Sequence, residues 1–235
     1  MKFLPTGISD FTQLIDKKRY FVDKTRYIEK ISSFAKDYLY FVRPRRFGKS
    51  LFLSMLGTYF DVYMKDSFDL YFKDTWIHTH PTDDQGAYQV IRLDFSKVSS
   101  DISCAEGDFN QSVGLEILLC ARKYQKFYDQ DFLDRLSGID TAKNRLYYYC
   151  SEAAIRGYRL YLLVDEYDNF TNTILSGNGR DRYDEITHSD GFLRSFFKVV
   201  KTGFDRIFLA DISPLIMNAL TSGSSLDVRI LGSCA

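Results

Sequence analysis

The sequence predicts an α/β fold in three layers, with a mainly parallel sheet between two layers of helices. Two kinds of segment alternate along the 235 residues. Short apolar runs such as 38–42, 160–165 and 207–211 are typical of buried strands, and longer segments with apolar residues three or four positions apart are typical of helices. Alternation of this kind favours parallel pairing, because each crossover places a helix on one face of the sheet.

The expected elements begin after an N-terminal arm that extends to about residue 24. Thr25 or Asp23 is a suitable cap for the first helix, because a side-chain oxygen there can accept a hydrogen bond from the first turn. That helix carries five apolar residues on one face, which are Tyr27, Ile28, Ile31, Phe34 and Ala35. The later elements follow in this order: strand 38–42, helix 49–60, a polar irregular segment 61–88, strand 90–95, helices near 107–128 and 140–156, strand 160–165, a polar loop 171–189, a helix near 190–202, strand 207–211 and a helix at 214–220. The expected buried stripe of helix 49–60 is Leu51, Phe52, Met55, Leu56, Tyr59 and Phe60.

A basic, glycine-containing loop between strand 38–42 and helix 49–60 has the layout of a phosphate-binding loop. Gly48 allows backbone N–H groups to approach phosphate oxygens, and the helix start adds a positive dipole end. Lys49 would reach the β- and γ-phosphates of a nucleotide, and the Ser50 hydroxyl would hold Mg²⁺. Arg43 stands where the common motif has its first glycine, so a solvated basic turn is the alternative for this stretch alone. The expected nucleotide-binding residues are Arg45, Arg46, Phe47, Gly48, Lys49, Ser50 and Leu51.

Two adjacent carboxylates, Asp165 and Glu166, end the apolar run 160–165. In open α/β sheets, ligands bind outside the carboxyl ends of the strands. Asp165 would hold the metal, directly or through water, and Glu166 would accept a proton from the water that attacks the γ-phosphate. The alternative is that the two acids cap the segment that follows them.

Four motifs resemble the bacterial AAA-ATPase-like family. They occur in the family's order and are Gly7-Ile8-Ser9-Asp10-Phe11, Phe21-Val22-Asp23-Lys24-Thr25, Arg43-Pro44-Arg45-Arg46-Phe47-Gly48-Lys49-Ser50 and Val164-Asp165-Glu166-Tyr167-Asp168. The resemblance extends to about Gly223 and includes Arg43, which stands in the family's own loop. It implies a P-loop NTPase fold and ATP as the ligand. Members often carry a C-terminal PD-(D/E)XK nuclease-like domain.

The last predicted strand ends in Asp211, with Ser213 two residues later. In ATPases with a catalytic glutamate, a polar residue at this strand tip senses the γ-phosphate, so both residues are candidates. The family usually shows Thr-Gly where this chain has Ala210-Asp211, and an ordinary turn before the next helix is the alternative. We expect one nucleotide-binding domain over residues 1–235, without a fifth core strand, a helical lid or the nuclease-like domain, as in a chain truncated at its C-terminus. An arginine finger is not assignable; Arg180, Arg182 and Arg194 are candidates in name only.

Composition limits the partners that can be expected. Acidic and basic residues balance at 31 each, so a nucleic-acid partner is possible but is not supported by charge. No apolar run approaches membrane-spanning length and no signal peptide is visible, which favours a cytoplasmic chain without membrane contact. The four scattered cysteines and three histidines lack the spacing of a zinc site. The segment Tyr20-Phe21-Val22 either covers an adenine base or packs onto the core.

The expected activity is Mg²⁺-dependent ATP hydrolysis that drives a conformational process. In this scheme Lys49 stabilises charge, Ser50 and Asp165 hold the metal, and Glu166 activates water. One alternative is a nucleotide-dependent interaction module that does not hydrolyse ATP. A second is the ATPase part of a nucleic-acid-processing protein. Kinase activity is a third option, but the sequence shows no acceptor site. A protein partner or self-association is compatible with each.

Overall fold

A computed structural model describes residues 3–4, 7–34, 38–44, 46–98, 104–167, 191–211 and 228–231 of the chain. The strands in these ranges are β1 (Tyr38–Val42), β2 (Gln89–Asp94), β3 (Leu160–Asp165), β4 (Arg206–Asp211) and β5 (Val228–Leu231). The α-helices are α1 (Phe11–Asp16), α2 (Arg26–Ser33), α3 (Lys49–Phe60), α4 (Phe68–Phe72), α5 (Trp76–Thr79), α6 (Ala105–Lys123), α7 (Gln130–Ser137), α8 (Ala142–Ile155) and α10 (Phe192–Gly203). Short 3₁₀ helices are η1 (Val62–Ser67), η2 (Phe95–Lys97) and η4 (Gln125–Phe127).

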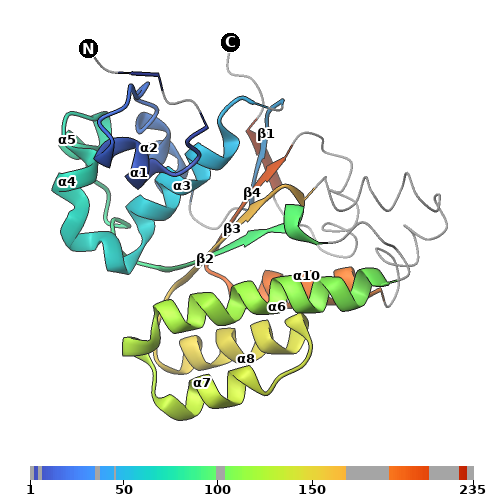
Figure 1. The fold of residues 1–235 in the computed structure, drawn as a ribbon. Helices are drawn as coiled ribbons and strands as arrows, with labels where there is room; N and C mark the ends of the chain where they lie inside the picture. The colour runs from blue at the N-terminus through green and yellow to red at the C-terminus, as the bar shows by residue number, and fades with distance from the viewer. Residues whose placement is uncertain are drawn as a thin grey trace.

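The strands form one sheet in the order β2-β3-β4-β1-β5, and every pairing between them is parallel (Figure 1). All six residues of β3 are buried, as expected for a continuous apolar run inside a parallel sheet. β4 lies between β1, which leads into the glycine-containing loop, and β3, which ends in Asp165. The predicted α/β class is therefore confirmed, and the carboxyl ends of the strands meet at one edge.

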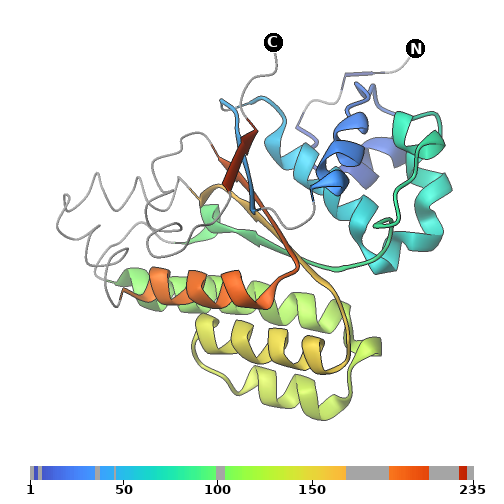
Figure 2. The ribbon, with the colours of Figure 1, turned by 180° about the vertical axis from the view of Figure 1, so that it is seen from behind.

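Helices cover both faces of the sheet (Figures 1 and 2). One face carries α3, over which the short helices α1, α2, α4 and α5 gather, and the other carries α6 and α10, with α8 packed beneath them and α7 outermost. Each face has its own cluster of buried apolar side chains. Val90, Tyr161 and Leu163 belong to the α3 face, whereas Ile91, Leu162 and Val164 belong to the α6 face. Strand alternation thus assigns each residue of the sheet to one layer.

α3 is buried on every side, which is more than the single stripe expected from the sequence. Leu53 is fully buried, and the polar residues Ser54 and Thr58 are also buried. The reason is that the sheet covers one side of α3 while α1 and the segment after α3 cover the others. A helix enclosed in this way keeps apolar residues all around, so its periodicity is weak.

Segment 61–88 was expected to be irregular, and this expectation was wrong. It contains η1, α4 and α5, with Phe72 and Ile77 buried in the cluster on the α3 face. The three elements are four to six residues long, so each supplies only one or two turns of periodic pattern. The predicted helix near 107–128 is shorter in the structure, and the separate helix α7 follows it.

Thr25 does not cap α2 with its side chain, whereas Asp23 Oδ1 accepts a hydrogen bond from the N–H of the N-cap residue Thr25 at 2.8 Å. Asp23 Oδ2 also accepts a hydrogen bond from the backbone N–H of Trp76 at 2.8 Å, and Thr25 Oγ1 accepts one from Ile77 at 3.1 Å. Both side chains therefore satisfy the N-terminal turn of α5. The cap prediction was wrong for Thr25, because a second helix start that is distant in sequence lies within reach of its hydroxyl oxygen.

A fifth strand was expected to be missing, but β5 pairs in parallel with β1, with Tyr38 opposite Val228. β1 consequently has neighbours on both sides. The predicted loop 171–189 and helix 214–220 lie outside the described residues. Among the helices that the structure describes, none combines the length and the apolar character that crossing a bilayer requires.

Candidate functional site at the carboxyl edge of the sheet

The loop from β1 to α3 turns sharply at Gly48, the N-cap residue of α3. Gly48 has φ 76° and ψ 27°, in the left-handed region that glycine adopts without steric cost. A Cβ added there would meet no atom within 4 Å, so the backbone conformation rather than crowding requires glycine. Arg46, two residues earlier, also has positive φ, at 67°. Turns of this kind make a concave surface of backbone N–H groups at a helix start, which suits an anion.

Lys49 lies beneath this loop and is only 6% exposed. Its Nζ donates hydrogen bonds to the carbonyl oxygens of Arg43 at 3.1 Å and Pro44 at 3.4 Å. A solvated basic turn would leave this ammonium in water, so the burial of Lys49 disagrees with that alternative. Phosphate oxygens bind an ammonium more strongly than neutral carbonyls do, and a phosphate in the loop could replace either bond.

The other predicted loop residues differ in their surroundings. Ser50 and Leu51 are partly buried in the first turn of α3. Phe47, at the tip of the loop, is 61% exposed. Arg46 is exposed, and Arg45 lies outside the described residues.

Asp165 ends β3 and is buried on the α3 face of the sheet. Its Oδ2 accepts a hydrogen bond from Nη2 of Arg92 at 3.2 Å. Its Oδ1 is also buried and has no hydrogen-bond partner among the described residues. A buried carboxylate oxygen without a partner is costly unless a ligand or metal completes it. This oxygen fits a site for a hard cation such as Mg²⁺.

Glu166 follows directly and has φ 57°, which is unusual for a residue other than glycine. Its side chain is partly buried, next to the fully buried strand. Positive φ at this position turns the chain sharply where β3 leaves the sheet. Strained backbone of this kind is concentrated at functional sites.

Asp211 ends β4 and lies between the two motifs, opposite Val42 in the register. Its backbone carbonyl accepts a hydrogen bond from the Arg43 N–H at 2.9 Å, so β4 helps to hold the start of the loop. The carboxylate Oδ2 accepts a hydrogen bond from Tyr40 Oη at 3.3 Å. Tyr40 belongs to the cluster on the α6 face, opposite to the face that carries Asp165. The second candidate sensor, Ser213, lies outside the described residues.

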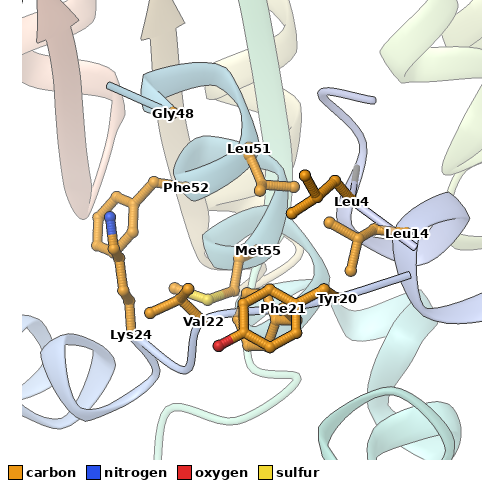
Figure 3. Close-up of a pocket in the computed structure, with 10 residues that line it drawn as sticks. All are labelled: Leu4, Leu14, Tyr20, Phe21, Val22, Lys24, Gly48, Leu51, Phe52 and Met55. Atoms are coloured by element: carbon orange, nitrogen blue, oxygen red, sulfur yellow. The ribbon is translucent and has the colours of Figure 1, made fainter. Parts of the chain in front are cut away.

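A cavity of about 330 Å³ lies beside the loop, between α3 and the N-terminal arm (Figure 3). Gly48 stands at one end of its lining, and Tyr20, Phe21 and Val22 stand toward the other. Tyr20 and Val22 are at least half exposed, so they form a rim rather than part of the closed core. The lining residues are Leu4, Leu14, Tyr20, Phe21, Val22, Lys24, Gly48, Leu51, Phe52 and Met55. The wall is mainly apolar, which suits a flat heterocycle.

The described side chains alone do not form a complete metal site at this edge of the sheet. Among the described residues no group of three or more His, Cys, Asp or Glu side chains could hold an ion. The donors that fit are the Ser50 hydroxyl and Asp165, with nucleotide phosphates as the remaining ligands. His78 hydrogen-bonds to Asp69, and His80 stacks on Trp76, so both histidines have structural contacts.

Two residues near Asp165 were not recognised from the sequence. Arg92 lies in β2 on the same face as Asp165, and Asp94 pairs directly with Asp165 in the register. One signal was available, because Arg92 places a charge between the apolar residues Ile91 and Leu93. Its partner could not be identified, because β2 and β3 meet only through the folded sheet.

Asp10, in the first of the four motifs, makes a further contact that was not recognised from the sequence. Its Oδ2 accepts a hydrogen bond from Ser54 Oγ at 3.1 Å, one helical turn beyond Ser50 in α3. Burial raises the pKa of Asp10, but hydrogen bonds from Thr12, the Gln13 N–H and Ser54, together with the Arg92 charge, lower the pKa below its usual value overall. The first motif therefore contacts the helix that begins with Lys49.

Comparison with known proteins gives one match. A family model described as a predicted AAA-ATPase matches residues 5–221. No curated protein and no solved structure matches the chain.

Proposed function

Because this chain belongs to the AAA-ATPase-like family of predicted AAA-ATPases, we propose that it binds ATP with Mg²⁺ and hydrolyses the terminal phosphate. One observation carries the proposal. Lys49 is buried under the Gly48 turn, at the sheet edge where Asp165 has a buried oxygen without a partner among the described residues. A phosphate in the loop would pair with the Lys49 ammonium, and a cation bound to that phosphate would bind the buried oxygen of Asp165.

Each residue has a defined part in this scheme. The backbone N–H groups after Gly48 bind phosphate oxygens, and Lys49 Nζ neutralises charge on the β- and γ-phosphates. Ser50 and Asp165 hold Mg²⁺, which when bound neutralises phosphate charge and orients the leaving group. Glu166 orients a water molecule and accepts its proton as it attacks phosphorus.

The apolar cavity beside Gly48 accommodates the base in this proposal. Its position next to the phosphate loop agrees with a nucleotide that spans both. Phe52 and the rim residues Tyr20 and Val22 would contact the faces of the ring. Stacking of this kind recognises flat shape more than hydrogen-bonding pattern. We therefore expect ATP and other purine nucleotides to bind better than pyrimidine nucleotides.

The test is calorimetric titration of ATP with Mg²⁺ into wild type and Lys49→Ala. Loss of the ammonium removes charge-assisted contacts worth about 1.5–3 kcal/mol each, so we expect affinity to fall at least tenfold. Lys73→Ala is the matched control, because Lys73 is an exposed lysine outside the site. Equal affinity in wild type and Lys49→Ala would refute the phosphate-loop assignment.

Turnover separates hydrolysis from the second candidate, a nucleotide-dependent interaction module. An enzyme converts bound ATP to ADP within seconds to minutes under single-turnover conditions. An interaction module that does not hydrolyse ATP keeps the bound nucleotide unchanged.

The balance of 31 acidic and 31 basic residues gives no electrostatic support for nucleic acid as partner. A protein partner or a second copy of the chain fits the proposal better.

A further inference from the structure

Arg92 is a charged residue between the apolar residues Ile91 and Leu93 of β2, and its surroundings explain its presence. It lies on the α3 face of β2, with Val90 before it and Asp94 after it on the same face. In the register Arg92 stands opposite Leu163, two residues before Asp165. Its guanidinium extends along β3 and donates a hydrogen bond to Asp165 Oδ2 at 3.2 Å.

The geometry of this pair is that of an exchangeable contact. Asp165 has a side chain that is 4% exposed, whereas that of Arg92 is 37% exposed. Arg–carboxylate pairs are frequently bidentate, with both carboxylate oxygens bonded. Here Oδ2 alone is bonded to Arg92, while the buried Oδ1 has no partner among the described residues. Arg92 therefore compensates the buried charge only in part.

The charge of Arg92 also acts on a second carboxylate. The positive charge of Arg92 contributes to the lowered pKa of Asp10, after burial, which raises it, and three hydrogen bonds to its carboxylate. Asp10 is joined to α3 through Ser54, one turn from the proposed metal ligand Ser50. Arg92 thus hydrogen-bonds to Asp165 of the proposed metal site, and its positive charge also acts on the carboxylate of Asp10.

We propose that Arg92 is an exchangeable counter-ion that holds Asp165 in the metal-free protein and competes with Mg²⁺ for that carboxylate. The inference rests on the proposed function, because it assumes that Asp165 binds the metal. When the cation arrives with the nucleotide, Arg92 leaves Oδ2 and remains near Asp10. Arg92 therefore stabilises the metal-free protein and weakens binding of the cation.

The experiment measures how strongly Mg²⁺ assists nucleotide binding. A fluorescent ATP analogue is titrated into the protein with EDTA and again with Mg²⁺, and the ratio of the two dissociation constants is the metal coupling. In Arg92→Gln the competing charge is gone, and we expect the ratio to rise about tenfold while the melting temperature in EDTA falls. Arg92→Lys keeps a competing charge and should remain near wild type.

Arg159→Gln is the matched control. Arg159 donates to Asp84 at 3.2 Å, the same distance as in the Arg92 pair, but it lies just before β3 at the opposite edge of the sheet. Its substitution should leave the metal coupling unchanged. A second test variant is Asp10→Asn, which removes the alternative partner of Arg92 and should lower the ratio several-fold.

The outcomes are distinct. A raised ratio in Arg92→Gln with a lowered ratio in Asp10→Asn supports the inference. An unchanged ratio in Arg92→Gln, or a loss of affinity that is equal with and without Mg²⁺, overturns it and makes Arg92 a passive partner or a phosphate ligand. If Arg92→Gln does not fold, an unchanged or raised ratio in Asp10→Asn overturns it as well. Absence of nucleotide binding in wild type would refute the proposed function itself.

Discussion

Glu166 combines a backbone conformation that costs energy with the chemistry that the proposed reaction needs. Its φ of 57° is a conformation that costs a residue other than glycine on the order of 1 kcal/mol. The buried strand β3 before Glu166 and the buried Tyr167 after it hold the backbone in this conformation. Two substitutions can separate the shape of this residue from its charge.

Glu166→Gln should bind ATP as wild type does and hydrolyse it at least 100-fold more slowly. The amide keeps the size of the side chain and loses the base, so the effect falls on the chemical step. Single-turnover hydrolysis measures it, with Glu106→Gln in α6 as the control, because Glu106 is exposed. Unchanged turnover in the variant, in a wild type that hydrolyses ATP, would assign the acidic pair to structure.

Glu166→Gly should raise the free energy of unfolding by less than about 1 kcal/mol, because glycine adopts positive φ without strain but its greater freedom in the unfolded chain offsets part of the gain. Turnover should be lost together with the carboxylate. Urea unfolding at equilibrium is the measurement. A destabilised variant would mean that the Glu166 side chain contributes more to packing than the backbone strain costs.

At the scale of elements, one serine of α3 hydrogen-bonds to the N-terminal end of α1, beside the apolar contacts between the two helices. The Ser54 hydroxyl donates to Asp10 at 3.1 Å and accepts a hydrogen bond from the Phe11 N–H at 2.9 Å. It thereby satisfies the N-terminal turn of α1 from outside the helix. Phe11 is fully buried, so its N–H has no access to water.

Ser54→Ala should consequently lower the free energy of unfolding by about 1–3 kcal/mol, because it leaves a buried N–H without a partner. Ser151→Ala is the control, since the Ser151 hydroxyl bonds only to the carbonyl of Tyr147 within α8. Both variants are compared by urea unfolding. A loss in Ser54→Ala no larger than in the control would show that α1 is held by its apolar contacts alone.

Sequence patterns identified β1, α3 and β3 almost to the residue, because each combines a compact apolar run with a clear boundary. Gly48 marks the start of α3, and the pair Asp165-Glu166 marks the end of β3. The same reasoning failed for α4 and α5, whose few residues carry no complete period. Lys49 was identifiable within a local motif. The Arg92 contact with Asp165 was not, because strand pairing alone brings these residues together.

At the scale of the whole molecule, nucleotide binding should raise the melting temperature. A ligand present at about 100 times its dissociation constant stabilises the folded state by about 2.7 kcal/mol. For a chain of this size that corresponds to roughly 5–10 °C. ADP with Mg²⁺ in a thermal shift experiment avoids turnover, and Lys49→Ala should show little of the increase. An equal increase in both proteins would place the ligand elsewhere.

The position of β1 in the sheet has a consequence for how the chain folds. β1 is the first strand to be synthesised, yet Tyr38 pairs with Ile207 and Val228, which follow roughly 170 and 190 residues later. Pairing across such separations is slow, because long segments lose their freedom before the contacts form. During synthesis on the ribosome, both edges of β1 remain unpaired until β4 and β5 have been made. Unpaired apolar strands of this kind expose the nascent chain to aggregation.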